Sequence, residues 1–266
     1  MRVSEISCKT ALSPSRLPGL DYTLNPYIGC QHQCIYCYAP SILHMPRNEW
    51  ETSIKVKRNI PLILSKELKQ KKRGVIGLST VTDPYQPIEK TYKLTQYCLK
   101  VIQKKNFPLC IQTKSDLILR DKELIKNFDN VEVMVSIGTL NEGHKRILEP
   151  SSSTIIQRLS ILKAFSDTPV KTSVFFGPIY PSITPDDIPE ILDVFIDYQV
   201  DEIMIDYLHT KNELMMPLTH LIQNNPQLPM SYALEKLMNQ KTTFQVIRET
   251  IYAYLKHTDI TVTDAF

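Results

Sequence analysis

Three cysteines in one short loop constrain this chain more than any other feature. Cys30, Cys34 and Cys37 have a C-x3-C-x2-C spacing within residues 25–41, NPYIGCQHQCIYCYAPS. Thiolates this close in sequence can converge on one metal centre without a folded core to gather them. A [4Fe–4S] cluster takes four ligands, and its protein ligands are cysteine thiolates. The loop therefore predicts a cluster with one iron left open for a small molecule that the cluster reduces.

Two other chemistries use cysteines. A disulfide framework does not suit a chain of 266 residues whose first ten, MRVSEISCKT, lack the apolar stretch of a secretory signal. A structural zinc site made of the three cysteines with His32 or His44 fits the spacing and stays an alternative. If the loop holds a cluster instead, His32 is expected to be an exposed loop residue. The remaining cysteines, Cys8, Cys98 and Cys110, lack cluster spacing.

The composition is that of an ordinary globular chain. Hydrophobic residues make up 42% and charged residues 22%. No apolar run approaches the roughly 18 residues that a membrane span needs, so no membrane partner is expected. A cytoplasmic, reducing location is expected, because an oxygen-sensitive cluster requires one.

Positive charge is concentrated in residues 55–73. Eight lysines and arginines face a single acid, Glu67, there, while the whole chain carries a net charge of only +3. A basic patch of this kind can bind the phosphates of a nucleic acid. The alternative is a solvated helix face that ends in a charged turn.

Short apolar strands alternate with helices along most of the chain. Strands are expected at 75–79, 109–113, 131–137, 170–176 and 202–206, and helices at 62–70, 89–104, 116–128, 153–165 and 185–198. Residues 1–24 are expected to be irregular, and 54–57 to be a short extended piece. This alternation indicates βαβ units and a parallel sheet.

Further motifs follow the expected strands. They read TVTDPYQP at 80–87, QTKS at 112–115 and LEP at 148–150, and an aromatic residue, Tyr36, precedes the third cysteine. With these residues the chain resembles the radical S-adenosylmethionine (SAM) superfamily over residues 22–188, and within it the branch related to spore photoproduct lyase. The resemblance implies a partial (β/α)6 TIM-type barrel with parallel strands over residues 1–210. A helical C-terminal appendage is expected over 211–266, with one or two helices between 231 and 256.

The resemblance also implies an activity. SAM would chelate the open iron of the [4Fe–4S] cluster, and an electron from the cluster would cleave its sulfonium bond. The 5′-deoxyadenosyl radical so formed would abstract hydrogen from a substrate, for which nucleic acid is one candidate class. An external one-electron donor of the flavodoxin or ferredoxin type is expected as a partner.

The residues of the site are carried over by their place in the motifs. The resemblance gives Tyr38 a catalytic role in radical transfer and assigns cofactor binding to Tyr36, Thr82, Lys114, Ser136, Glu149 and Arg158. In this scheme Lys114 pairs with the SAM carboxylate. Each residue also has a structural alternative: turn formation by Thr82 and Asp83, a core hydroxyl for Ser136, an ion pair for Glu149 with Arg158, and packing for the tyrosines.

One residue departs from the lyase pattern. The lyase has a hydrogen-donating cysteine three residues before the aspartate of its motif, and this chain has Thr80 there. A hydroxyl does not return a hydrogen atom as a thiol does, which argues against a DNA-repair lyase proper. A nucleic-acid-binding protein stabilised by zinc or a cluster, without turnover, is the alternative from another functional class.

Overall fold

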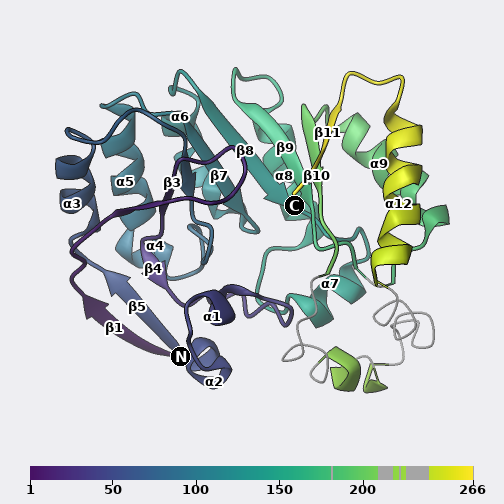
Figure 1. The fold of residues 1–266 in the computed structure, drawn as a ribbon, viewed down its shortest axis with the longest axis horizontal. Coiled ribbons are helices and arrows are strands. Elements are labelled where there is room, and N and C mark those ends of the chain that lie inside the picture. Colours follow the sequence, from purple (N-terminus) through teal and green to yellow (C-terminus); the bar gives the residue numbers. More distant parts are fainter. Residues whose placement is uncertain (181, 209–217, 222, 226–239, 266) are drawn as a thin grey trace.

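An open sheet of eight strands forms the centre of the molecule (Figure 1). The computed structural model describes residues 1–180, 182–208, 218–221, 223–225 and 240–265. The strand order is β11-β10-β9-β8-β7-β6-β3-β2, and all neighbours are parallel except β2 and β3. The strands are β2 (Leu12–Pro14), β3 (Tyr22–Leu24), β6 (Ile76–Leu78), β7 (Leu109–Thr113), β8 (Val131–Ser136), β9 (Lys171–Phe176), β10 (Glu202–Ile205) and β11 (Thr261–Asp264).

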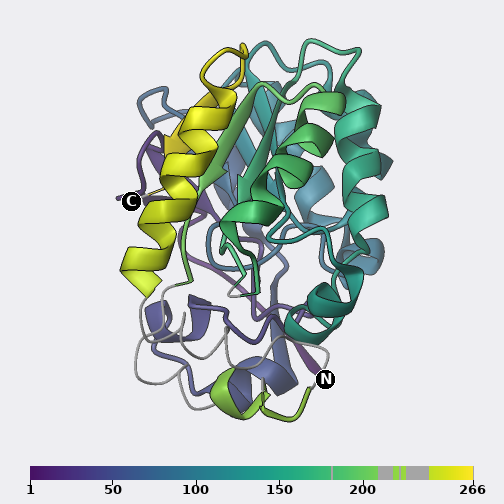
Figure 2. The ribbon, with the colours of Figure 1, turned by 90° about the vertical axis from the view of Figure 1, so that its right-hand side faces the viewer.

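Helices cover the outer face of this sheet. Figure 2 shows α8, α9 and α12 side by side in front of the strands. Their bounds and those of the other covering elements are α3 (Ile60–Glu67), α4 (Glu89–Tyr92), α5 (Leu94–Gln103), η1 (Asp116–Asp121), α6 (Lys122–Ile125), α7 (Glu142–Leu148), α8 (Ile155–Phe165), η2 (Pro185–Asp187), α9 (Ile188–Asp197) and α12 (Gln240–Leu255). Helix α9 shows why they pack here, because its buried residues Ile188, Ile191, Leu192 and Phe195 form one apolar stripe.

A second, smaller sheet supports the cysteine loop. Its order is β1-β5-β4, with bounds β1 (Arg2–Ile6), β4 (Tyr27–Ile28) and β5 (Ser53–Lys57). Gly29 connects β4 to Cys30 with a φ of +94°, and a Cβ there would lie 2.4 Å from the carbonyl oxygen of Ser53. Only glycine fits this turn, since it lacks the Cβ. Two short helices follow the loop, α1 (Ala39–Ile42) and α2 (Arg47–Thr52).

The fold class expected from the sequence is confirmed: parallel strands alternate with helices in an open barrel-like sheet. The expected strands and helices between 54 and 206 are present, although the helix expected over 89–104 is interrupted at Lys93, which has a left-handed backbone. The irregular structure expected for 1–24 is wrong, because β1, β2 and β3 lie there. Isolated segments of three to five residues carry too little periodicity to be recognised as strands.

The C-terminal segment contributes a strand that sequence patterning missed. β11 pairs in parallel with β10 and extends the sheet, and α12 packs against α9. Of the helical region expected over 231–256, residues 231–239 lie outside the described residues, and α12 accounts for the rest. The domain boundary near residue 210 stays a prediction. No helix in the described ranges is both long and apolar enough to cross a membrane.

Candidate cluster and cofactor site

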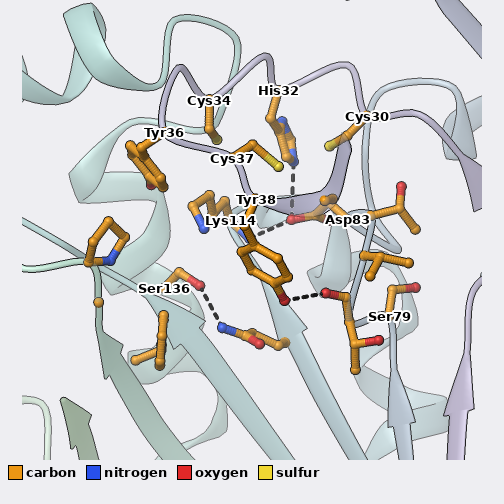
Figure 3. A pocket seen from close by; sticks show the side chains of 18 of the residues that line it. Cys30, His32, Cys34, Tyr36, Cys37, Tyr38, Ser79, Asp83, Lys114 and Ser136 are labelled. Atoms are coloured by element: carbon orange, nitrogen blue, oxygen red, sulfur yellow. Dashed lines mark hydrogen bonds and ion pairs between the residues drawn. The ribbon is translucent and has the colours of Figure 1, made fainter. Parts of the chain in front are cut away.

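A pocket opens at the carboxyl ends of the parallel strands, beneath the cysteine loop (Figure 3). The three cysteines, Tyr36, Tyr38, Thr82, Lys114 and Ser136 all line it. Eight of the ten residues predicted for the site therefore meet in one pocket, although they come from the loop and three separate strands.

The three thiols point into the same end of the pocket (Figure 3). Burial raises the pKa of all three, that of Cys30 to about 12. Buried thiolates therefore need a positively charged partner, which a metal centre supplies. The donor set fits a [4Fe–4S] cluster held by three cysteines, since Cys8, Cys98 and Cys110 do not line the pocket.

A single metal ion fits the loop less well. Within the described ranges, no three side chains of His, Cys, Asp or Glu lie close enough to share one ion. His32 lines the pocket beside the cysteines, but both of its ring nitrogens have other neighbours: Nδ1 lies 3.2 Å from the carbonyl oxygen of Ser151, and Nε2 lies 3.2 Å from Oδ2 of Asp83 (Figure 3). The thiols therefore lie in one pocket without forming the tight tetrahedral set of a structural zinc site.

His32 is buried, with 2% of its surface exposed, so the expectation of an exposed loop residue is wrong. The reason is its contact with Asp83, which follows β6. Asp83 accepts hydrogen bonds of 2.8 Å from the amide of Tyr85, the hydroxyl of Thr113 and the amide of Lys114. Burial acts to raise the pKa of Asp83, but His32 and the amides of Lys114 and Tyr85 lower it to about 2. Asp83 thus joins the cysteine loop to the ends of β6 and β7.

Thr82 makes a second link between β6 and the cysteine loop. Its hydroxyl donates a 2.6 Å hydrogen bond to the carbonyl oxygen of Gly29 and accepts one of 2.9 Å from Nε2 of Gln86. Gln86 Nε2 also donates to Gly29, at 3.2 Å. Two side chains of the TVTDPYQP motif therefore hold the residue before Cys30.

Lys114 follows β7 and projects toward the loop. Its Nζ lies 6.0 Å from the centre of the Tyr36 ring. Burial acts to lower the pKa of Lys114, but Glu149 and Cys34 outweigh it and raise the pKa. The lysine therefore carries its positive charge at neutral pH, beside the thiols.

Glu149 and Arg158 lie behind Tyr36 rather than on the pocket wall. They form a fully buried ion pair, and the Tyr36 hydroxyl donates a hydrogen bond to Glu149. Arg158 also donates to the carbonyl oxygen of Ser136, at 2.8 Å. Burial acts to raise the pKa of Glu149, but Arg158 and Lys114 lower it to about 2. In this position the pair supports Tyr36 and the end of β8.

Ser136 and Tyr38 also line the pocket (Figure 3). The Ser136 hydroxyl accepts a 3.3 Å hydrogen bond from Nε2 of Gln112. The Tyr38 side chain extends across the pocket, and its hydroxyl donates a 2.6 Å hydrogen bond to the carbonyl oxygen of Thr80 (Figure 3). Burial, Cys37 and Asp206 raise the pKa of Tyr38 to about 12, so this phenol keeps its proton at neutral pH.

The far wall of the pocket was not foreseen from the sequence. It consists of residues that follow or end β9 and β10, namely Phe175, Gly177, Pro178, Asp206, Tyr207 and Leu208. In the sequence, these residues could be recognised only by their place directly after an expected strand, because residues after parallel strands meet at one edge of a sheet. No recognisable motif marks them.

The chain is similar to known proteins in both sequence and fold. Residues 24–195 match the family model "Radical SAM superfamily". An uncharacterized protein of Methanocaldococcus jannaschii is 33% identical over 98% of this chain and 96% of its own length. An uncharacterized protein of Mycobacterium tuberculosis is 32% identical over 68% of this chain and 56% of its own length.

Two solved structures show the same fold. Spore photoproduct lyase complexed with dinucleoside spore photoproduct superposes with a TM-score of 0.68, at 14% identity, over 98% of this chain and 81% of the lyase. Streptococcus suis SuiB bound to S-adenosylmethionine gives a TM-score of 0.54, at 14% identity, over 91% of this chain and 46% of SuiB. The family match covers more than half of the chain and contains all three cysteines. The chain therefore belongs to the radical SAM superfamily and is an enzyme of that type.

Proposed function

We propose that this enzyme holds a [4Fe–4S] cluster through Cys30, Cys34 and Cys37 and binds SAM in the adjoining pocket. When bound, the cluster supplies the electron that cleaves SAM to methionine and a 5′-deoxyadenosyl radical, which takes hydrogen from a substrate. One observation carries the proposal: three thiols and a half-buried lysine line one pocket at the carboxyl ends of the strands. Electrons would come from an external donor of the flavodoxin or ferredoxin type.

The chain's own residues would hold and orient SAM. Lys114 is charged and lies beside the thiols, where it can pair with a carboxylate. Thr82, Ser136 and Tyr36 also line the pocket and would complete the SAM site with their hydroxyls and ring. Fixed polar groups around a pocket favour one orientation of a bound cofactor.

The substrate would enter against the far wall. Phe175, Pro178, Tyr207 and Leu208 make that wall largely apolar, which suits a flat or apolar part of a substrate. Asp206 adds one carboxylate for a polar group. No residue of the basic segment 55–73 lines the pocket, so we do not include that segment in the proposed substrate site.

Tyr38 is the residue we propose for hydrogen transfer. Thr80 provides no thiol, and of the six cysteines only the three in the loop line the pocket. The Tyr38 phenol, protonated at neutral pH, is hydrogen-bonded to Thr80 itself. The Tyr38 hydroxyl is therefore in hydrogen-bond contact with Thr80, the position at which the lyase pattern has its cysteine.

Anaerobic reconstitution tests the cluster and the cleavage together. The chain is incubated with iron and sulfide, reduced with dithionite in the presence of excess SAM, and assayed for 5′-deoxyadenosine. About four irons per chain are expected, with 5′-deoxyadenosine formation that Cys34→Ala abolishes. Cys98→Ala is the matched control, since it removes a buried thiol outside the pocket.

A colourless protein that retains zinc and forms no 5′-deoxyadenosine would overturn the proposal. It would favour the alternative of a metal-stabilised nucleic-acid-binding protein without turnover. Equal loss of product in Cys34→Ala and Cys98→Ala would show that the cysteine loop has no special role.

A further inference from the structure

A concentrated basic surface lies at one end of the molecule. Eight cations from α3, α5 and the turns that follow them make up this basic end: Lys66, Lys69, Lys71, Lys72, Arg73, Lys100, Lys104 and Lys105. All are exposed except Lys71, which is half-buried. The basic end thus includes only part of the basic segment 55–73 and adds three lysines from α5.

Tertiary structure brings these two groups together. Helices α3 and α5 pack side by side (Figure 1). The turns after them are joined directly, because Nε of Arg73 donates a 2.8 Å hydrogen bond to the carbonyl oxygen of Asn106. The cations of both helices therefore form one continuous surface.

The charges on this surface are not neutralised. In the described part of the chain, none of the eight cations forms an ion pair with a carboxylate. Three nearby acids contact other groups: Glu67 accepts from the amides of Ala11 and Leu12, Asp21 accepts from the amide of Val75, and Asp129 accepts from Nδ2 of Asn106. The eight cations outnumber these three acids, so the surface has an excess of positive charge and favours a polyanionic partner.

The cations in β5 and just after it have partners of their own. Lys55 pairs with Glu49 at 3.1 Å, and Arg58 pairs with Glu5 at 3.4 Å. Lys57 donates to the carbonyl oxygen of Asn25 at 2.9 Å. These three residues serve the small sheet and are not part of the basic end.

Aromatic rings lie among the cations. Tyr97 is 48% exposed on α5, with Nζ of Lys100 5.7 Å from its ring centre. Tyr22 lies under Lys71, whose Nζ is 5.5 Å from its ring centre. Exposed aromatic rings between cations are typical of nucleic-acid surfaces, where they contact sugars or bases.

The basic end lies opposite the pocket. The turns after α3 and α5 lead into the amino ends of β6 and β7, whereas the pocket is at the carboxyl ends of the same strands. We propose that the basic end binds the phosphate backbone of a nucleic acid and leaves the pocket free. This surface would anchor the enzyme to a polyanion, and the inference does not depend on the reaction in the pocket.

The test is binding of a fluorescein-labelled duplex DNA oligonucleotide, followed by fluorescence anisotropy at several salt concentrations. The double substitution Lys100→Glu with Lys104→Glu is compared with Lys163→Glu with Lys256→Glu. All four lysines are exposed and the two variants have the same net charge, but Lys163 and Lys256 lie outside the basic end. Thermal unfolding checks that both variants remain folded.

We expect the affinity of the unmodified chain to fall steeply with salt. The Lys100/Lys104 variant should bind at least about tenfold more weakly. The slope of its log affinity against log salt concentration should be smaller in magnitude by about 2, because each lost phosphate contact removes about one unit. The Lys163/Lys256 variant should bind within about twofold of the unmodified chain. Formation of 5′-deoxyadenosine should be the same in all three proteins.

Three results would overturn the proposal. Equal weakening in both variants would show a response to net charge alone. Binding that does not change with salt would rule out phosphate contacts as its source. Displacement of the DNA by polyglutamate at equal charge concentration would show that the surface accepts any acidic chain.

Discussion

At the scale of single residues, the ion pair between Glu149 and Arg158 behind Tyr36 carries the largest desolvation cost that we expect in the site. Glu149 and Arg158 are each about 1% exposed, so neither charge has access to water. Taking two charges out of water is costly, and the cost is recovered only while both partners remain. The hydrogen bonds from Tyr36 to Glu149 and from Arg158 to Ser136 tie this pair to the pocket wall.

Removing one partner should therefore be strongly destabilising. Glu149→Gln is expected to lower the free energy of unfolding by about 3 kcal/mol, because it leaves the buried Arg158 charge unpaired. Chemical denaturation of the cluster-free protein measures this. Glu123→Gln, which removes an exposed ion pair with Lys126, serves as the control and should cost less than about 1 kcal/mol. Similar losses in both variants would contradict the prediction.

The same pair should make stability depend on pH. The pKa of Glu149 is lowered to about 2 in the folded chain, against 4.5 for a free glutamate. A lowered pKa contributes stability that is complete above pH 4.5 and is lost as the pH falls toward about 2. The stability difference between the unmodified chain and Glu149→Gln should therefore shrink over that range. Denaturation curves at several pH values check this, and a constant difference would count against it.

At the scale of elements, Asp83 connects the cysteine loop to the ends of β6 and β7. It receives hydrogen bonds from the start of the 84–88 turn and from the end of β7, and it contacts His32 in the cysteine loop. One carboxylate thus fixes the loop relative to two strand ends. The sequence suggests only an Asp-Pro turn at this position, because the partners from β7 and the loop are remote along the chain.

Asp83→Asn should disturb the cysteine loop more than the rest of the fold. An amide nitrogen would replace one acceptor oxygen and leave a buried donor unsatisfied, at a cost of about 1–3 kcal/mol. We expect a smaller fraction of chains to take up iron during reconstitution. Asp121→Asn is the control, because Asp121 is also buried but does not line the pocket. The two substitutions should lower the melting temperature similarly, and only the first should lower the iron content.

At the scale of the whole molecule, the cysteine loop is supported by both sheets. The small sheet holds Gly29 and the loop's entry, and the large sheet supplies the strand ends below it. A ligand that binds only the folded arrangement stabilises the whole chain. The cluster should therefore act on global stability, beyond the loop itself.

Cluster loading should raise the melting temperature of the chain. Stabilisation of roughly 3 kcal/mol corresponds to a ligand at 100 times its dissociation constant, which is about 6–12 °C for a chain of this size. Anaerobic calorimetry before and after reconstitution measures the shift. Cys34→Ala should show none, and an equal shift in that variant would mean that iron acts elsewhere on the chain.

The sequence by itself determined the superfamily, the parallel α/β fold and most of the pocket. The reason is that these depend on local information: a cysteine spacing, apolar periodicity, and short motifs placed directly after strands. Thr82, Lys114 and Ser136 could be assigned to one edge because all parallel strands end on the same side. The same local patterns did not reveal β1, β2, β3 and β11, which are short strands with little periodicity of their own.

Only the tertiary structure decided which residues act together. The burial of His32 depends on Asp83, 51 positions further along the chain. The far wall of the pocket comes from β9 and β10, whose end residues carry no motif. The basic end combines two helices and excludes the paired cations of β5. Such contacts depend on how strands and helices pack, and packing joins residues that no short stretch of sequence contains.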